Sequence, residues 1–96
     1  MNGNGTLERS VQIVNRLGLH ARPAAEFVKL AGRFAAEVVV EKDGLAVNGK
    51  SIMGVLMLAA EHGSHITIRA EGRDAEEALL ALSDLVGRGF EEAYEE

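Results

Sequence analysis

Apolar residues recur along this chain with two different periods, and the order in which the periods alternate limits the possible folds most. Stretches with every second residue apolar are typical of half-buried strands, whereas apolar residues three or four positions apart indicate helices with one buried face. Within 96 residues the order is strand, helix, strand, strand, helix, strand, helix. A sheet whose helices cover one face buries its apolar side and leaves the other face in water. The sequence therefore predicts an α+β fold, an open-faced β-sandwich.

Local signals set the bounds of the expected elements. Asp43-Gly44 between two apolar runs predicts a hairpin, while Ser51 and Asp74 are residues that favour helix N-caps. Residues 90–96 are expected to be a loosely held acidic tail, with Phe90 and Tyr94 as its candidate anchors. The predicted strands span residues 7–14, 37–41, 45–48 and 65–70, and the predicted helices run from Pro23 to about Ala35 or Ala36, from Ser51 to about Leu58, and from Asp74 to the glycines at 87 and 89.

Length and composition limit the class of protein. We expect one domain over residues 1–96, with its core at about 7–88, because 96 residues suffice for one modest core. A net charge of −5 and 4% aromatic residues argue against nucleic acid as a partner. The longest apolar run, residues 52–60, is far shorter than the roughly 20 residues that span a bilayer. The absence of a leader and of cysteine favours a cytoplasmic protein, and without a coiled-coil seam we expect a monomer.

His20 lies where a loop changes to a helix. Pro23 is tolerated at the first helical position and biases Arg22 away from helical backbone, so the helix is expected to begin at or just before Pro23. The helix start, at Ala21, Arg22 and Pro23, offers unpaired N–H groups and the positive end of the dipole to an anion. The Arg22 guanidinium is a planar fork suited to phosphate oxygens. A loop histidine that only satisfies backbone groups is the alternative, but a nucleophile, an anion site and a cation together favour a phosphoryl carrier.

Two segments carry a resemblance to a known family. Gly18-Leu19-His20-Ala21-Arg22-Pro23-Ala24-Ala25 resembles the active-site signature of the histidine-containing phosphocarrier proteins (HPr) of the bacterial phosphoenolpyruvate-dependent phosphotransferase system. Gly49-Lys50-Ser51-Ile52-Met53-Gly54-Val55 resembles the regulatory-serine segment of that family, and the similarity extends from about Leu7 to Arg88. It implies a four-stranded antiparallel sheet with three helices on one face. It also implies that His20 accepts a phosphoryl group on Nδ1 from enzyme I and passes it to an enzyme IIA domain, with Arg22 stabilising the phosphate.

The segment that begins at Ser51 has two interpretations. Ser51 is a helix cap on physical grounds, and the resemblance implies that it is also a regulatory phosphorylation site for a serine kinase. Apolar residues on a helix this short cannot all be buried, so an exposed patch next to the cationic site is expected to dock partner proteins. The candidates for that patch are Leu19, Ile52, Met53 and Leu56.

Other classes of site find less support. His62 and His65 flank a turn without clustered carboxylates or thiols, so no metal site is predicted. The sequence contains no nucleotide-binding loop or catalytic constellation either, so we expect no cofactor, and a carrier whose partners supply catalysis rather than an enzyme.

Two questions stay open from the sequence. Leu17 stands where many sugar-transport members carry Asn or Ser. Residues 15–18 and 89–92 resemble the nitrogen-related branch, while residues 49–54 resemble the kinase-regulated branch. Sugar uptake and a regulatory relay are therefore both possible. The alternative from another class is a regulatory binding module that acts through the surface of Ser51, Ile52 and Met53 and makes little use of His20.

Overall fold

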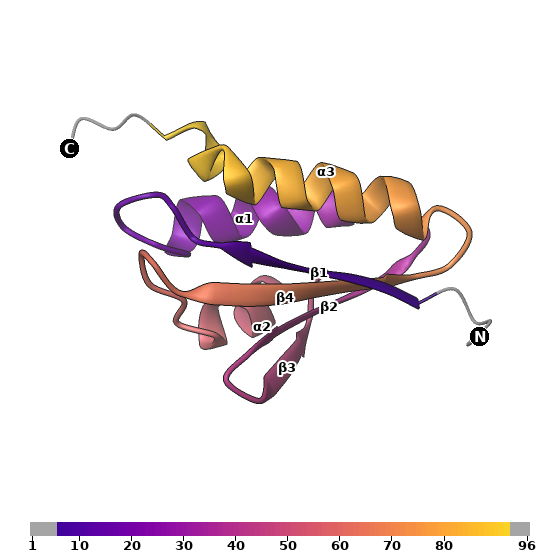
Figure 1. The fold of residues 1–96 in the computed structure, drawn as a ribbon, viewed down its shortest axis with the longest axis horizontal. Helices are drawn as coiled ribbons and strands as arrows, with labels where there is room; N and C mark the ends of the chain where they lie inside the picture. Colours follow the sequence, from indigo (N-terminus) through magenta and orange to yellow (C-terminus); the bar gives the residue numbers. More distant parts are fainter. Residues whose placement is uncertain (1–5, 93–96) are drawn as a thin grey trace.

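A computed structural model describes residues 6–92, which form an antiparallel sheet of four strands, three α-helices and a short 3-10 turn. The strand order is β1-β4-β2-β3, and α1 and α3 lie side by side over one face of the sheet (Figure 1). This arrangement confirms the open-faced sandwich. The elements are β1 (Thr6–Gln12), α1 (Ala21–Ala31), β2 (Glu37–Lys42), β3 (Leu45–Asn48), α2 (Ile52–Met57), β4 (His65–Glu71), α3 (Ala75–Gly87) and η1 (Gly89–Glu91).

The register of the sheet separates a buried face from a wet face. β4 lies between β1 and β2, with Ile68 opposite Arg9 on one side and Val40 on the other. Alternate residues of β4, such as Ile66 and Ile68, are buried under the helices. On the opposite face Arg69 is paired with a glutamate from each neighbouring strand. The alternation of apolar and polar residues in the sequence thus corresponds to side chains that face the core and the solvent in turn.

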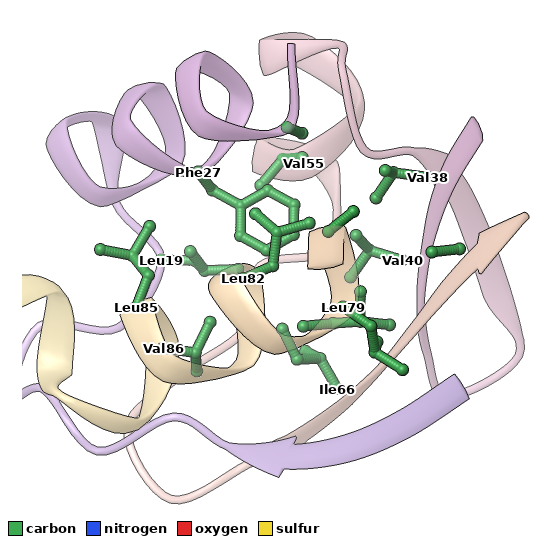
Figure 2. Packing of buried hydrophobic residues seen from close by; sticks show 14 of the residues in the cluster. Leu19, Phe27, Val38, Val40, Val55, Ile66, Leu79, Leu82, Leu85 and Val86 are labelled. Carbon is green, nitrogen blue, oxygen red and sulfur yellow. The ribbon is translucent and has the colours of Figure 1, made fainter. Parts of the chain in front are cut away.

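The core lies between the sheet and the helices. Figure 2 shows Phe27 of α1 packed with Leu82 of α3 and Val55 of α2, and the three side chains have no exposed surface. Val40 of β2 borders the same cluster from the sheet side (Figure 2). All three α-helices therefore contribute to one core, and α2 contributes chiefly through Val55.

The bounds of α1 differ from the expectation at both ends. The helix begins at Ala21, so Arg22 is helical although Pro23 follows it. Pro23 is the third helical residue, where an N–H group would have no intrahelical acceptor, so the proline costs no hydrogen bond there. The predicted end at Ala35 or Ala36 is wrong, because α1 stops at Ala31. The backbone N–H groups of those two alanines instead donate to the Asp74 carboxylate, at 2.9 and 2.8 Å.

Of the two N-caps predicted for α2 and α3, the structure shows a capping hydrogen bond for only one. Ser51 caps α2 as predicted, since its Oγ accepts the Gly54 N–H at 3.1 Å. Asp74 stands at the N-cap position of α3 but makes no side-chain bond to that helix. Its carboxylate is used by the α1–β2 connection, so it joins the start of α3 to the segment before β2.

Residues 90–92 are not a loose tail, and the prediction of Phe90 as an anchor is confirmed. Phe90 is fully buried with a φ of 58°, within the turn η1 that follows α3. The buried ring brings the chain back against the body, and Glu92 follows directly. The other candidate anchor, Tyr94, lies outside the described residues. Over residues 6–92 no helix is both long and apolar enough to cross a membrane.

Candidate functional site

The loop that carries His20 is fixed by backbone contacts on both sides. Gly18 has a φ of +72°, a conformation that side chains rarely allow, and a Cβ there would lie 2.5 Å from the Ala60 carbonyl oxygen. The next residue, Leu19, donates its N–H to that same oxygen at 2.9 Å. The Leu19 side chain is only 4% exposed and packs in the core. The histidine therefore follows a turn that neither rotates nor shifts freely.

His20 occupies the N-cap position of α1. Its backbone is extended, with φ −80° and ψ −169°, and its carbonyl accepts the Ala24 N–H at 3.0 Å. The imidazole makes no capping bond, and its side chain is 37% exposed. The ring is thus open to a partner molecule while its backbone belongs to the helix.

A single carboxylate holds the ring and the neighbouring cation. Glu92 Oε2 lies 3.0 Å from His20 Nε2 and 2.9 Å from Arg22 Nη1, and Oε1 accepts the Asn15 amide at 3.0 Å. The Glu92 side chain is 16% exposed. Burial raises its pKa, but the hydrogen bonds from Asn15 and His20 and the charges of His20 and Arg22 outweigh burial and hold the pKa below its ordinary value. Glu92 is consequently a carboxylate, an acceptor only, at neutral pH.

The contact with Glu92 determines which ring nitrogen is available for chemistry. A carboxylate can only accept, so a neutral imidazole that hydrogen-bonds Glu92 through Nε2 carries its proton on that nitrogen. The lone pair then lies on Nδ1. A neutral ring nitrogen with a free lone pair is a nucleophile. This agrees with the Nδ1 acceptor that the family resemblance implies for His20.

The start of α1 has the features that the prediction of an anion site requires. Ala21 and Arg22 are exposed and Pro23 is buried, and the first turn of α1 contains no acidic residue. The N–H groups of Ala21 and Arg22 have no intrahelical acceptor, and the Arg22 guanidinium binds the same Glu92 oxygen as the His20 ring. An open groove of about 500 Å³ continues from His20 between residues 16–19 and residues 59–62. Leu17 is exposed at the side of this groove.

The apolar docking patch predicted next to Ser51 is only partly exposed at the surface. Ile52 and Met53 are exposed, Met53 by 68%, as a docking surface requires. Leu19 is buried in the core and contributes no surface, so its assignment to the patch is wrong. Leu56 is partly buried against the core, and Met57, which no signal in the sequence singles out, is exposed by 64%. The apolar surface of α2 is therefore Ile52, Met53 and Met57.

The two other histidines lie near each other in the sequence, at the turn before β4 and at its start. His62 lies in the turn between α2 and β4, as predicted, and His65 is the first residue of β4. Over residues 6–92 no group of three or more His, Asp or Glu side chains is placed to hold a metal ion.

Comparison with known proteins identifies the family. Residues 7–88 match the family model described as the PTS HPr component phosphorylation site. The phosphocarrier protein HPr of Neisseria meningitidis serogroup A is 48% identical over 86 residues, which cover 90% of this chain and 97% of the relative. The crystal structure of HPr from Bacillus anthracis superposes with a TM-score of 0.84 at 54% identity, covering 86% of this chain and 99% of the other. This chain belongs to the HPr family.

A second kind of relative also shares the HPr fold. The catabolite repression protein Crh of Bacillus subtilis is 44% identical, with a TM-score of 0.71 over 86% of this chain and 95% of its own, and its structure is described as an intertwined dimer with a swapped domain. Membership of the HPr family makes the chain a phosphocarrier of the phosphotransferase system, not a catalyst in itself.

Two residues of the site carry little signal in the sequence. Asn15 follows the end of β1 without any motif of its own, and Glu92 stands in a run of glutamates that is typical of a solvated tail. One signal points to Glu92. Phe90, a large apolar residue two positions earlier, indicates that the chain returns to the core before the acidic end.

Proposed function

We propose that His20 accepts a phosphoryl group from phosphorylated enzyme I and passes it to an enzyme IIA domain. The observation that carries this proposal is the ring of His20, whose Nε2 is engaged by Glu92 while Nδ1 is left with its lone pair at the start of α1. The HPr family membership supports the donor and acceptor classes.

The chemistry needs little from the carrier itself. The Nδ1 lone pair attacks phosphorus, the bond from phosphorus to the donor atom breaks, and its electron pair stays with the donor. The Arg22 guanidinium and the N–H groups of Ala21 and Arg22 stabilise the negative charge of the phosphoryl oxygens. Transfer onward reverses these steps toward the acceptor. The partner's active site supplies the remaining catalysis, so the carrier acts as a co-substrate.

The experiment is phosphorylation of the purified chain with enzyme I, magnesium and phosphoenolpyruvate. Intact-mass spectrometry at alkaline pH should find one added phosphoryl group that is lost in acid, and His20→Ala should not acquire it. His62→Ala is the matched control, because His62 lines the same groove and should leave labelling unchanged. Failure to label the folded wild type with an enzyme I of proven activity would refute the proposal.

We infer that Ser51 is a regulatory phosphorylation site. Its Oγ is engaged by the Gly54 N–H, and it directly precedes the exposed apolar residues Ile52 and Met53. A dianion placed there would add charge beside an apolar docking surface and repel acidic partners. A serine kinase with ATP should modify the wild type but not Ser51→Ala. Phosphorylation elsewhere, or unchanged transfer to enzyme IIA after modification of Ser51, would contradict this role.

A second candidate function is a regulatory binding module. The similarity to Crh, a catabolite repression protein, and the exposure of Met53 and Met57 favour it. A module that acts only through Ser51, Ile52 and Met53 would keep its partner after His20→Ala and lose it after Met53→Asp. A carrier would lose phosphoryl transfer with the first variant.

Location and assembly follow from the same relay. Because the chain belongs to the HPr family, we expect it in the cytoplasm, together with the enzyme I and enzyme IIA that it would serve. We expect a monomer, although the related Crh structure is a dimer. Size-exclusion chromatography with light scattering tests this. Whether the accepting system serves sugar uptake or nitrogen-related regulation is decided by which enzyme IIA accepts the phosphoryl group.

A further inference from the structure

We propose that Glu92 and Asn15 are positioning residues for phosphoryl transfer, which hold the proton of His20 on Nε2 and so present Nδ1 to the phosphoryl group. The proposal rests on the proposed role of His20 as acceptor. It adds a requirement that the two signature segments do not contain, since both positions lie outside them. The contact between His20 and Glu92 joins residues 72 positions apart, so it exists only in the folded chain.

Asn15 connects the backbone before His20 with the group that contacts its ring. The side chain is 1% exposed, and its amide donates to the Gly18 carbonyl at 2.8 Å and to Glu92 Oε1 at 3.0 Å. One amide therefore fixes the turn that leads to the histidine and the carboxylate that binds the imidazole. Asn15 Oδ1 is buried and has no hydrogen-bond partner among the described residues. An unpaired buried acceptor is unfavourable, so the orientation of this amide is determined by its two donor bonds.

Glu92 is held in place by the chain that leads to it. The fully buried ring of Phe90 anchors the turn after α3, two residues before Glu92. Glu91, the residue between them, is exposed and pairs with Arg88, which also pairs with Asp84 at 2.8 Å. The two neighbouring glutamates thus bind different groups: Glu92 binds the site and Glu91 binds the end of α3. This difference provides a matched control.

The donors around Glu92 require a carboxylate. The amide of Asn15, Nε2–H of His20 and the guanidinium of Arg22 are three donors that converge on its two oxygens. A glutamine would offer one oxygen, and its NH2 group would face a donor. If that NH2 faces Nε2, it favours the tautomer with the proton on Nδ1, whose lone pair is then unavailable.

The role of the carboxylate continues through the transfer step. As Nδ1 forms its bond to phosphorus and the donor atom leaves with the old bonding pair, positive charge develops on the ring. Glu92 faces that charge at Nε2, and the Nε2 proton stays in place. When the phosphoryl group moves on, the nitrogen–phosphorus pair returns to Nδ1 and the ring is neutral again with the same proton. Glu92 therefore orients the ring in both directions and does not itself exchange a proton.

The test compares Glu92→Gln with Glu91→Gln. Each variant is mixed with phosphorylated enzyme I, and the single-turnover rate of His20 phosphorylation is measured by quenched mass spectrometry. We expect Glu92→Gln to slow the transfer by about tenfold to a hundredfold, the range that a displaced reacting group typically loses. Glu91→Gln should stay within about twofold of the wild type, and Glu92→Asp, which keeps the carboxylate, should recover part of the rate.

A second measurement is independent of transfer. Nitrogen-15 spectra of the neutral His20 ring show which nitrogen carries the proton. We expect Nε2–H in the wild type and in Glu91→Gln, and an increased share of Nδ1–H in Glu92→Gln. Asn15→Asp, which replaces the amide donor with a second carboxylate opposite Glu92, should show the same change while keeping the side-chain volume; thermal unfolding verifies that it folds.

The outcomes separate the two proposals. A wild type that is not phosphorylated refutes the proposed function, and the nitrogen-15 spectra still decide the role of Glu92. A wild type that is phosphorylated, with Glu92→Gln as fast as Glu91→Gln or with an unchanged proton position, overturns the positioning role.

Discussion

Replacing Gly18 with alanine tests how firmly the loop before His20 is fixed. The substitution places a Cβ 2.5 Å from the Ala60 carbonyl oxygen and 3.0 Å from Glu61 Cα, at a residue whose φ is +72°. Ordinary van der Waals contact begins at 3.4 Å, so one backbone segment must move by about 0.9 Å from the other. Neither neighbour is the flexible end of a side chain that could move away.

Two costs add at this position. The left-handed conformation of an alanine costs about 1–2 kcal/mol. Moving the Ala60 carbonyl weakens its hydrogen bond from the Leu19 N–H, 2.9 Å in length, a bond whose net contribution is about 0.5–1.5 kcal/mol. We therefore expect Gly18→Ala to lower the free energy of unfolding by about 1.5–3.5 kcal/mol, the conformational and hydrogen-bond costs taken together.

The assay is urea unfolding, with Gly44→Ala as the matched control. Gly44 also has a positive φ, +86°, but an added Cβ there meets nothing within 4 Å. The free energy of unfolding of Gly44→Ala should fall only by the cost of the left-handed conformation, about 1–2 kcal/mol. Phosphorylation of His20 should slow in Gly18→Ala and not in Gly44→Ala. Equal destabilisation by the two variants would refute the argument that contact with Ala60 fixes this loop.

Substitutions at three further residues test the helix ends. Gly87→Ala, at the last residue of α3 with open space around it, should raise the free energy of unfolding by about 0.5–1 kcal/mol in urea melts, and a decrease would contradict this. Ser51→Ala removes the N-cap of α2 and should cost about 1 kcal/mol, while Ser51→Asp, which keeps an acceptor, should cost less. The N–H bond from Ala35, followed by that from Ala36, lowers the pKa of Asp74 in the folded state. The resulting stabilisation is complete above the ordinary carboxyl pKa of about 3.9 and is lost as pH falls through the lower folded value, so urea midpoints of Asp74→Asn should depend less on pH across that acid range.

The sequence is sufficient wherever a local signal sets the structure. The period of two places the alternate buried residues of β4, and Asp43-Gly44 places the hairpin between β2 and β3. Ser51 is identified as a cap because the bond it makes, to Gly54, lies three residues away. In each case the interaction that decides the outcome is encoded within a few residues.

The wrong predictions, by contrast, arise where contacts between distant parts of the chain decide the structure. Ala35 and Ala36 are good helix formers, yet their N–H groups bind Asp74, which lies 39 and 38 residues further along the chain. Leu19 is a candidate for docking because it is adjacent to His20, but the tight turn at Gly18 directs it into the core. The contacts that overrule the local preference come from elements distant in sequence.

The site itself combines both kinds of information. His20 and Arg22 lie in one short motif, so their chemistry can be inferred from that motif alone. The contact of His20 Nε2 with Glu92, however, comes from a residue beyond α3 and the buried Phe90. The motif supplies the histidine and a cation, and in our proposal Glu92 sets which ring nitrogen faces the phosphoryl group. A short signature can therefore identify a phosphocarrier, while the folded position of a residue 72 places away sets the orientation of its histidine.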